Sequence, residues 1–353
     1  DHGRPASARK FRTAGSARAA VAPARMMGVG QLAQDELISV IIPAHNVGRF
    51  IGRTLDSVLQ QTHRALDVVV VDDGSTDNTA DVVQSIAKGD PRMRLLRSDK
   101  LGVSAARNLA IAQAKAQLIA PIDADDIWHR DKLTRQLAIM RAGSDRLGLV
   151  YCWSRGIDDN DRVILPSWNN SSARGDVLQD IVIRGVAGNG STPLIKRRFI
   201  EEVGGYDATA TLSEDWKFYT ALAGVCEFDV VPQYLVGYRL HEDSASMTDA
   251  RRMEQAIAGC TAWVKRSWPD LPERVFVDRD NVLGVYLAFL AIRQRDYGAA
   301  LRYIGHSIRA RPTTLFSVEL LRLLALIPLH AAGLRHYNWR LWSKPAFADM
   351  PVN

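Results

Sequence analysis

The sequence predicts an α/β protein: a mixed, mostly parallel β-sheet flanked by helices, followed by a helical C-terminal extension. Short apolar runs at residues 37–42, 67–71 and 118–122 are long enough for buried strands, and each stops abruptly in polar residues. Apolar residues at helical spacing fill the intervals between these runs. Strands that alternate with helices in this way are typical of βαβ units and a parallel sheet.

The first half is expected to contain these elements in order: strand 38–43, helix 50–59, strand 67–71, helix 77–87, strand 93–96 and a helix capped by Ser104. Ligands of such sheets bind beyond the carboxyl ends of the strands, where residues 43–46 and 72–75 are expected. The turn at 72–75 matches neither the dinucleotide-binding glycine pattern nor the lysine-containing phosphate loop. An acidic residue there instead suits a hydrogen bond to a base or a ribose.

An acidic cluster ends the strand at 118–122. Alternation along an extended chain is expected to place Asp123 and Asp125 on one side and Asp126 on the other. Carboxylates this close repel one another unless a cation lies between them or one is protonated. Mg²⁺ or Mn²⁺ would satisfy them and keep positions for phosphates. The alternative is that Asp125 or Asp126 caps a helix starting near Trp128.

The second half is expected to alternate in the same way: helix 131–141, strand 149–153, a polar turn at 158–161, a polar segment at 188–192, strand 193–195 and strand 235–237. Ser213, Glu214 and Asp215 open an amphipathic helix. Ser213 as the N-cap, with two acids complementing the helix dipole, explains this pattern without any chemistry.

Four segments, at 40–46, 70–77, 102–108 and 123–126, resemble the family 2 glycosyltransferases of bacteria in their order and spacing, over about residues 37–245. The resemblance implies a GT-A (Rossmann-like) fold, a nucleoside-diphosphate sugar as donor, Mn²⁺ or Mg²⁺ as cofactor, and inversion at the anomeric carbon. It implies transfer of a sugar, expected from a UDP-sugar, to a hydroxyl of a glycan or lipid-linked acceptor. The expected process is synthesis of cell-surface or extracellular polysaccharide.

The resemblance also assigns residues to roles. Asp215 would be the general base and Glu214 its support. The nucleotide would be bound by Pro43, Ala44, Asn46, Asp73, Arg107 and Asp123. Asp125 and His241 would hold the metal, and Gly190, Ser191, Trp216 and Arg239 would contact the donor or the acceptor, with Arg239 or His241 near the diphosphate. His45 stands where the family often has tyrosine, in the position of a base-stacking residue.

Two other functions remain alternatives at this point. A sugar-phosphate nucleotidyltransferase would need a Gly-rich, lysine-containing loop after the first strand, and residues 43–46 do not form one. A non-catalytic scaffold that binds nucleotide or nucleic acid would use the formal net charge of +6. Its basic residues are scattered without interleaved aromatic residues, so no nucleic-acid partner is expected.

Composition and charge define the expected organisation of the chain. Residues 1–36 read as a disordered basic tail, 37–248 as the GT-A domain with nucleotide-binding (37–126) and acceptor (127–248) halves, and 249–353 as the helical extension. The segment 315–345 suits either a helix at an anionic membrane surface or a core or dimer-interface helix. The cysteines match no metal or redox spacing, so we expect a cytoplasmic protein, with peripheral attachment to the inner face of the membrane as an alternative.

Overall fold

The computed structural model describes residues 36–210, 212–241, 249–317, 320–321, 323–324, 327–328 and 345–353. The expected basic tail before residue 36 and most of the expected surface helix at 315–345 lie outside these residues. Residues 33–353 belong to one compact unit, so the sheet and the C-terminal helices are described together.

In the described part of the chain, one sheet contains nine strands. They are β1 (Ile38–Ala44), β2 (Leu66–Asp73), β3 (Met93–Ser98), β4 (Leu118–Pro121), β5 (Ile127–Trp128), β6 (Leu147–Ile157), β7 (Val163–Asn169), β8 (Leu194–Lys196) and β9 (Glu227–Arg239). Their order is β3-β2-β1-β4-β8-β6-β9-β5, and β7 pairs with β6. Strands β3, β2, β1, β4, β6 and β9 run in one direction and β5, β7 and β8 in the other, which confirms the mixed, mostly parallel sheet.

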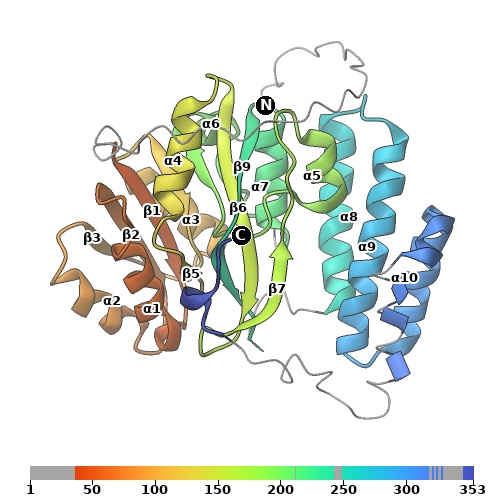
Figure 1. Ribbon diagram of the computed structural model, residues 1–353, viewed down its shortest axis with the longest axis horizontal. Coiled ribbons are helices and arrows are strands. Elements are labelled where there is room, and N and C mark those ends of the chain that lie inside the picture. Colours follow the sequence, from red (N-terminus) through yellow and green to blue (C-terminus); the bar gives the residue numbers. More distant parts are fainter. Residues whose placement is uncertain are drawn as a thin grey trace. The chain divides into compact units, whose positions relative to one another are not determined.

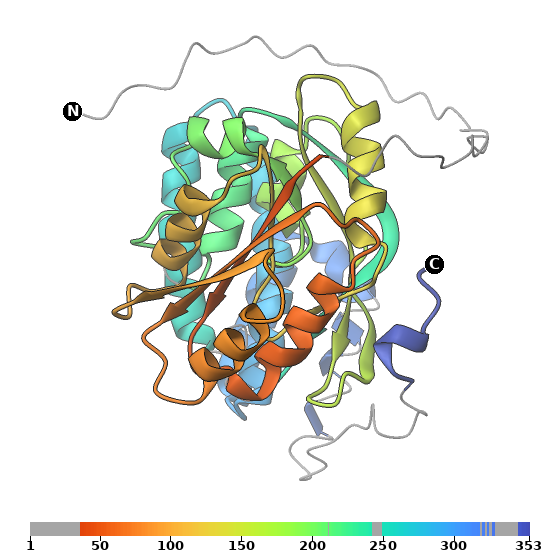
Figure 2. The same ribbon diagram turned by 90° about the vertical axis from the view of Figure 1, so that its left-hand side faces the viewer.

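Helices cover both faces of this sheet (Figure 1). They are α1 (Gly48–Leu59), α2 (Thr79–Ala87), α3 (Val103–Gln113), α4 (Lys132–Ala142), α5 (Leu178–Arg184), α6 (Arg197–Glu202), α7 (Glu214–Ala223), α8 (Ala250–Ser267), α9 (Glu273–Arg293) and α10 (Tyr297–Ala310). Apolar residues of α1, α2 and α4 pack on one face of the strands, and those of α3, α5, α6 and α7 on the other. Figure 2 shows α1 and α2, in red and orange, lying together against the strands of the first half.

The parallel pairing brings the carboxyl ends of the first strands to a common edge. Ala44 at the end of β1 pairs with Asp72 of β2, and Asp73 pairs with Ser98 of β3. The polar segments that follow β1 and β2 therefore begin beside each other, as the sequence predicts for a ligand site.

The C-terminal helices extend the core of the sheet domain. Val264 of α8 and Phe276 of α9 are buried in the same apolar cluster as the strands and α7. The helices α9 and α10 form an antiparallel hairpin, with Pro312 just beyond α10 (Figure 1). The last residues return to the sheet, since the Tyr234 N–H donates to the Val352 carbonyl (2.7 Å). Among the described residues, no helix combines the length and apolarity needed to cross a bilayer.

Three local expectations were wrong. Ile127 and Trp128 form a short strand, so no helix starts there for Asp125 or Asp126 to cap. Residues 123–126 form a turn closed by a hydrogen bond from the Asp126 N–H to the Asp123 carbonyl (3.1 Å), so the alternation of an extended chain does not apply to them. Ser104 does not cap α3, because the helix begins one residue earlier, after Gly102 at φ 90°.

Two glycines provide a test of this packing. A Cβ at Gly148 in β6 would lie 2.3 Å from the Cys226 sulfur and 2.6 Å from the Phe199 ring, whereas one at Gly259 in α8 would meet nothing within 4 Å. Gly148→Ala should therefore cost about 1–3 kcal/mol of stability through overpacking. Gly259→Ala should add about 0.5–1 kcal/mol through helix propensity. Urea denaturation of both variants checks this; equal effects would contradict the described packing of β6.

Candidate active site

The loop after β1 is held to the loop after β2 by polar contacts. His45 Nδ1 lies 2.7 Å from the Asp73 carbonyl, and the Asn46 N–H donates to Ser75 Oγ (3.0 Å). The Asn46 side chain in turn accepts from the Thr76 N–H (2.8 Å). Pro43 and Ala44 are buried at the end of β1, so their backbone and the exposed Asn46 form this part of the edge.

Asp73 is almost completely buried and organises the loop that leads into α3. Its Oδ1 accepts from the Ser98 hydroxyl (2.8 Å) and the Leu101 N–H (2.6 Å), and its Oδ2 accepts from the Gly102 N–H (2.8 Å). Burial alone would raise the pKa of Asp73, but these hydrogen bonds outweigh burial and hold the pKa below its usual value. Asp73 is therefore an ionised carboxylate whose oxygens already bind this loop.

Ser191 and Gly190 fix the acidic turn after β4. The Ser191 hydroxyl accepts from the Asp123 N–H (2.9 Å) and donates to Asp126 Oδ2 (2.5 Å). A Cβ at Gly190 would lie 2.8 Å from an Asp123 oxygen and 2.9 Å from an Arg107 nitrogen, so only glycine allows this close approach. The expected ligand contacts of Gly190 and Ser191 are thus, in this structure, contacts with the acidic turn itself.

Asp126 is the buried member of the acidic cluster. Besides Ser191, the Arg239 N–H donates to its Oδ1 (2.8 Å). Burial, with repulsion from Asp125 and Asp123, raises the pKa of Asp126 well above its usual value. The hydrogen bond from Arg239 joins the turn after β4 to the end of β9, which brings residues 239–241 next to Asp125.

Asp125 and His241 are brought together across the sheet. Asp125 Oδ2 lies 2.8 Å from His241 Nε2, and Arg49 of α1 lies 3.3 Å from His241 Nδ1. A guanidinium has only donors, so Nδ1 accepts from Arg49 and the neutral ring donates from Nε2 to Asp125. A carboxylate oxygen and an imidazole nitrogen form a donor set that suits Mn²⁺ and, through the oxygen, Mg²⁺. Within the described residues, no group of three or more His, Cys, Asp or Glu side chains is close enough to hold an ion, so the pair would leave positions for phosphate and water.

Arg107 of α3 connects the acidic turn to the start of α7. Its guanidinium, only 2% exposed, donates to Asp123 Oδ1 (2.6 Å) and Asp215 Oδ1 (2.7 Å), with Glu214 at 3.6 Å. Burial opposes its charge, but Asp215 and Asp123 outweigh burial and raise the pKa of Arg107 further. One buried cation is therefore shared by three carboxylates from two distant parts of the chain.

Asp215 combines partial exposure with an unusual titration. Its side chain is 24% exposed, so a ligand can reach it beside Arg107. Burial raises the pKa of Asp215 to about 7; Arg107 opposes this shift, whereas Glu214 and Asp123 add to it. Ser213 occupies the N-cap position of α7, but its hydroxyl pairs with Cys260 Sγ (3.2 Å) instead of capping the helix.

Two predicted ligand contacts lie inside the protein. The Arg239 side chain is fully buried over Phe50 and donates to the carbonyls of Asp125 (2.6 Å) and Asp158 (2.5 Å) and to the Asp161 carboxylate. The indole N–H of Trp216 donates to the Ile181 carbonyl of α5 (2.8 Å). In this structure both side chains support neighbouring loops and helices.

Some residues around the site were not singled out from the sequence. Arg49 was missed, although a cation in the first turn after the β1 loop could have been noted. The sequence also does not indicate a cluster of buried polar atoms around Arg107. Four of these atoms have no hydrogen-bond partner within the described part of the chain: Ser104 Oγ, Arg107 Nε and the hydroxyls of Tyr206 and Tyr219. No sequence pattern signals that group, because it arises only when α3 and α7 meet.

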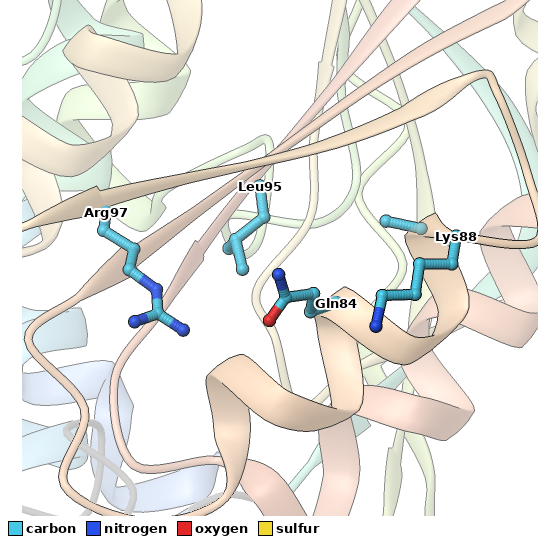
Figure 3. Close-up of a pocket in the computed structure, with 5 residues that line it drawn as sticks. Gln84, Lys88, Leu95 and Arg97 are labelled. Atoms are coloured by element: carbon cyan, nitrogen blue, oxygen red, sulfur yellow. The ribbon is translucent and has the colours of Figure 1, made fainter.

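Two surface hollows lie away from these residues. One lies between α2 and β3, where Gln84, Lys88, Leu95 and Arg97 surround it (Figure 3). The other lies among α5, α9 and the segment after α10 and includes Arg184 and Arg311. None of the predicted site residues lines either hollow, so the candidate site rests on the convergence of polar side chains.

Comparisons with known proteins show which family and fold the chain is similar to. The sequence model described as Glycosyl transferase family 2 matches residues 39–203. The putative teichuronic acid biosynthesis glycosyltransferase TuaG of Bacillus subtilis is 40% identical over 105 residues, which cover 30% of this chain and 42% of that protein. The chain spans less than half the length of the first curated relatives it matches.

Two solved structures share the fold. The mannosyltransferase PcManGT of Pyrobaculum calidifontis, in complex with GDP-Man and Mn²⁺, has a TM-score of 0.55 at 20% identity and covers 86% of this chain and 82% of its own. S. aureus TarS (1–349) with UDP-GlcNAc has a TM-score of 0.54 at 18% identity, with coverage of 85% and 86%. The sequence match assigns residues 39–203 to glycosyl transferase family 2, and the two structural likenesses show the GT-A fold.

Proposed function

We propose that this protein transfers a sugar from a nucleoside-diphosphate sugar to a hydroxyl of a glycan or lipid-linked acceptor, with inversion at the anomeric carbon. The observation that carries the proposal is the shared contact of Arg107 with Asp123 and Asp215. It puts a partly exposed carboxylate of suitable pKa next to the acidic turn at the edge where the sheet binds ligands. A donor and a general base thus meet in one site.

Asp215 is the proposed general base. It takes the proton of the acceptor hydroxyl while that oxygen attacks the anomeric carbon, and the bond from this carbon to the diphosphate oxygen breaks. No enzyme nucleophile takes part, so a single displacement inverts the configuration. Arg107 holds the Asp215 carboxylate in position, and Glu214 adds negative charge that keeps Asp215 basic.

The donor would occupy the edge formed by the loops after β1, β2 and β4. Asp73 keeps the loop at Leu101 and Gly102 in place beside the base and ribose, with Asn46 at the rim. Asp125 and His241 would hold Mn²⁺ or Mg²⁺, which when bound neutralises charge on the diphosphate. UDP-sugars and GDP-sugars are the candidates, because the two structural neighbours contain UDP-GlcNAc and GDP-Man.

The acceptor is proposed to belong to a surface or extracellular polysaccharide. Support comes from the name of the TuaG relative and from matches to chondroitin and hyaluronan synthases of Pasteurella multocida, each 34% identical over 134 residues. A cytoplasmic enzyme at the inner membrane face, with oligomerisation through its C-terminal helices as a further option, would fit such an acceptor. Assays of sugar transfer from a panel of UDP- and GDP-sugars test the proposal; turnover of none of them would contradict it.

The metal role predicts the behaviour of Asp125→Ala. This variant should bind nucleoside diphosphate without the gain in affinity that Mn²⁺ gives the wild type, because one of two proposed ligands is gone. Calorimetric titrations with and without Mn²⁺ measure this difference. Asp81→Ala, which removes an exposed acid from the first turn of α2, is the control. An undiminished Mn²⁺ effect in Asp125→Ala would rule out the metal role.

The base role predicts a folded but nearly inactive Asp215→Asn. Asparagine can still accept the hydrogen bond from Arg107 but cannot take a proton, so the transfer rate should fall by about 10²–10⁴-fold. Donor affinity should stay near that of the wild type. Asp180→Asn, which changes an acid in the first turn of α5, controls for charge at a helix start. Near-normal turnover of Asp215→Asn at saturating acceptor would refute the assignment.

The raised pKa of Asp215 predicts the pH dependence of the reaction. A base works only when ionised, so kcat/KM should be level above about pH 8, reach half of its maximum near the pKa of about 7 and fall about tenfold per pH unit below about pH 6. The residual activity of Asp215→Asn should lack this acid limb. Rates measured from pH 5 to 9 check both statements; an acid limb centred near pH 4 would show that Asp215 is not the titrating base.

A further inference from the structure

The diphosphate of a nucleotide sugar needs a cation, and the two arginines assigned to the site are already engaged. Arg107 is buried in ion pairs with Asp123 and Asp215. Arg239 is fully buried, and its Nε and both terminal nitrogens donate to protein oxygens. Neither guanidinium can turn to a ligand without breaking several hydrogen bonds and ion pairs that satisfy a buried charge.

Arg49 lies where such a cation is needed. It is the second residue of α1, directly after the β1 loop, and its side chain is 53% exposed. One terminal nitrogen is 3.3 Å from His241 Nδ1, and the other is 3.7 Å from an Asp159 oxygen. His241 Nε2 contacts Asp125, so His241 lies between the Arg49 guanidinium and Asp125. Arg49 is therefore close to the proposed metal ligand beside which the diphosphate is expected.

We infer that Arg49 binds the diphosphate of the nucleotide donor, in the role that the sequence pattern assigned to Arg239 or His241. The inference rests on the proposed function, because it takes a nucleoside diphosphate as ligand. It names a binding residue outside the segments that carry the family resemblance. Arg49 is a substrate-binding residue in this account and takes no part in proton transfer.

The Arg49 guanidinium can exchange its contact with His241 for one with the diphosphate. A phosphate oxygen is a stronger acceptor for a guanidinium than a neutral imidazole nitrogen, and bidentate pairing strengthens the bond. When Arg49 turns to the diphosphate, it releases Nδ1 of His241, and the imidazole proton can then reside there.

Phe50 gives the guanidinium a fixed platform. The Arg49 guanidinium lies over the Phe50 ring, 4.4 Å from its centroid. The His241 ring also packs on Phe50, with the two ring centroids 5.2 Å apart. The buried Phe50 ring also contacts Arg239 (4.7 Å). Arg53, one turn further along α1, pairs with Asp161 (3.0 Å) and donates to the Asp159 carbonyl (2.7 Å), which holds the neighbouring β6–β7 turn in place. The position of the Arg49 side chain is therefore determined by its contacts with Phe50, His241 and the β6–β7 turn.

The test compares Arg49→Gln with Arg64→Gln. Both variants remove one charge from an exposed arginine, but Arg64 lies just before β2, at the opposite end of that strand from the site. Calorimetry with Mn²⁺ should show UDP or GDP, whichever the wild type binds, held about 10-fold more weakly by Arg49→Gln, as expected for a lost charge-assisted hydrogen bond. UMP or GMP should lose less, the free nucleoside nothing, and Arg64→Gln should match the wild type.

A second measurement separates direct contact from support of His241. Affinity for Mn²⁺ alone, followed by electron paramagnetic resonance, should not be lower in Arg49→Gln than in the wild type, because Arg49 contacts Nδ1 of His241 and adds a positive charge beside the proposed metal ligands. A drop in Mn²⁺ affinity equal to the loss of nucleotide affinity would mean that Arg49 acts through His241, and would overturn the inference. Equal binding of the diphosphate by wild type and Arg49→Gln would overturn it as well, with the proposed function intact. Failure of the wild type to bind any nucleoside diphosphate would overturn both proposals.

Discussion

A single buried cation shapes the candidate active site. Arg107 is almost completely enclosed, and an enclosed guanidinium is tolerated only when carboxylates pair with it. Its partners are Asp123 at the end of β4 and Asp215 at the start of α7, which are far apart in sequence. This pairing draws the nucleotide side and the acceptor side of the sheet together. Burial raises the pKa of Asp215, and Arg107 offsets this only in part because its one positive charge is shared by three carboxylates.

Regular elements of the fold could be predicted from the sequence because they depend on local patterns. Strands β1 and β2 are buried on both faces, so they read as continuous apolar runs, and their polar ends mark the ligand edge. The acids at 123–126 and 214–215 could also be identified from the local sequence, because they stand at the end of an apolar run and at the start of an amphipathic helix. The turn at 123–126 was read as extended chain because the strand β5 that follows is only two residues long and pairs with β9, more than a hundred residues later.

Side-chain partners could not be predicted, since they depend on which elements meet. The local sequence does not show that the Arg239 side chain is buried over Phe50 whereas the Arg49 side chain is exposed. The difference arises because Arg239, at the end of β9, packs against the β6–β7 turn and donates to Asp161. Ser191 likewise reads as a polar loop residue, but it bridges two carboxylate-bearing residues of the acidic turn. Motif resemblance therefore locates the site, whereas packing decides which of its side chains face a ligand.

A double-mutant cycle on stability tests the shared role of Arg107 most directly. Asp123→Asn, Asp215→Asn and the double variant would be unfolded in urea at pH 8, above the pKa of about 7 of Asp215. Each single change leaves Arg107 one strong partner, but the double change leaves a buried guanidinium with only Glu214 at 3.6 Å. The account predicts that the double variant loses at least about 1 kcal/mol more than the sum of the single losses. Additive losses would contradict it.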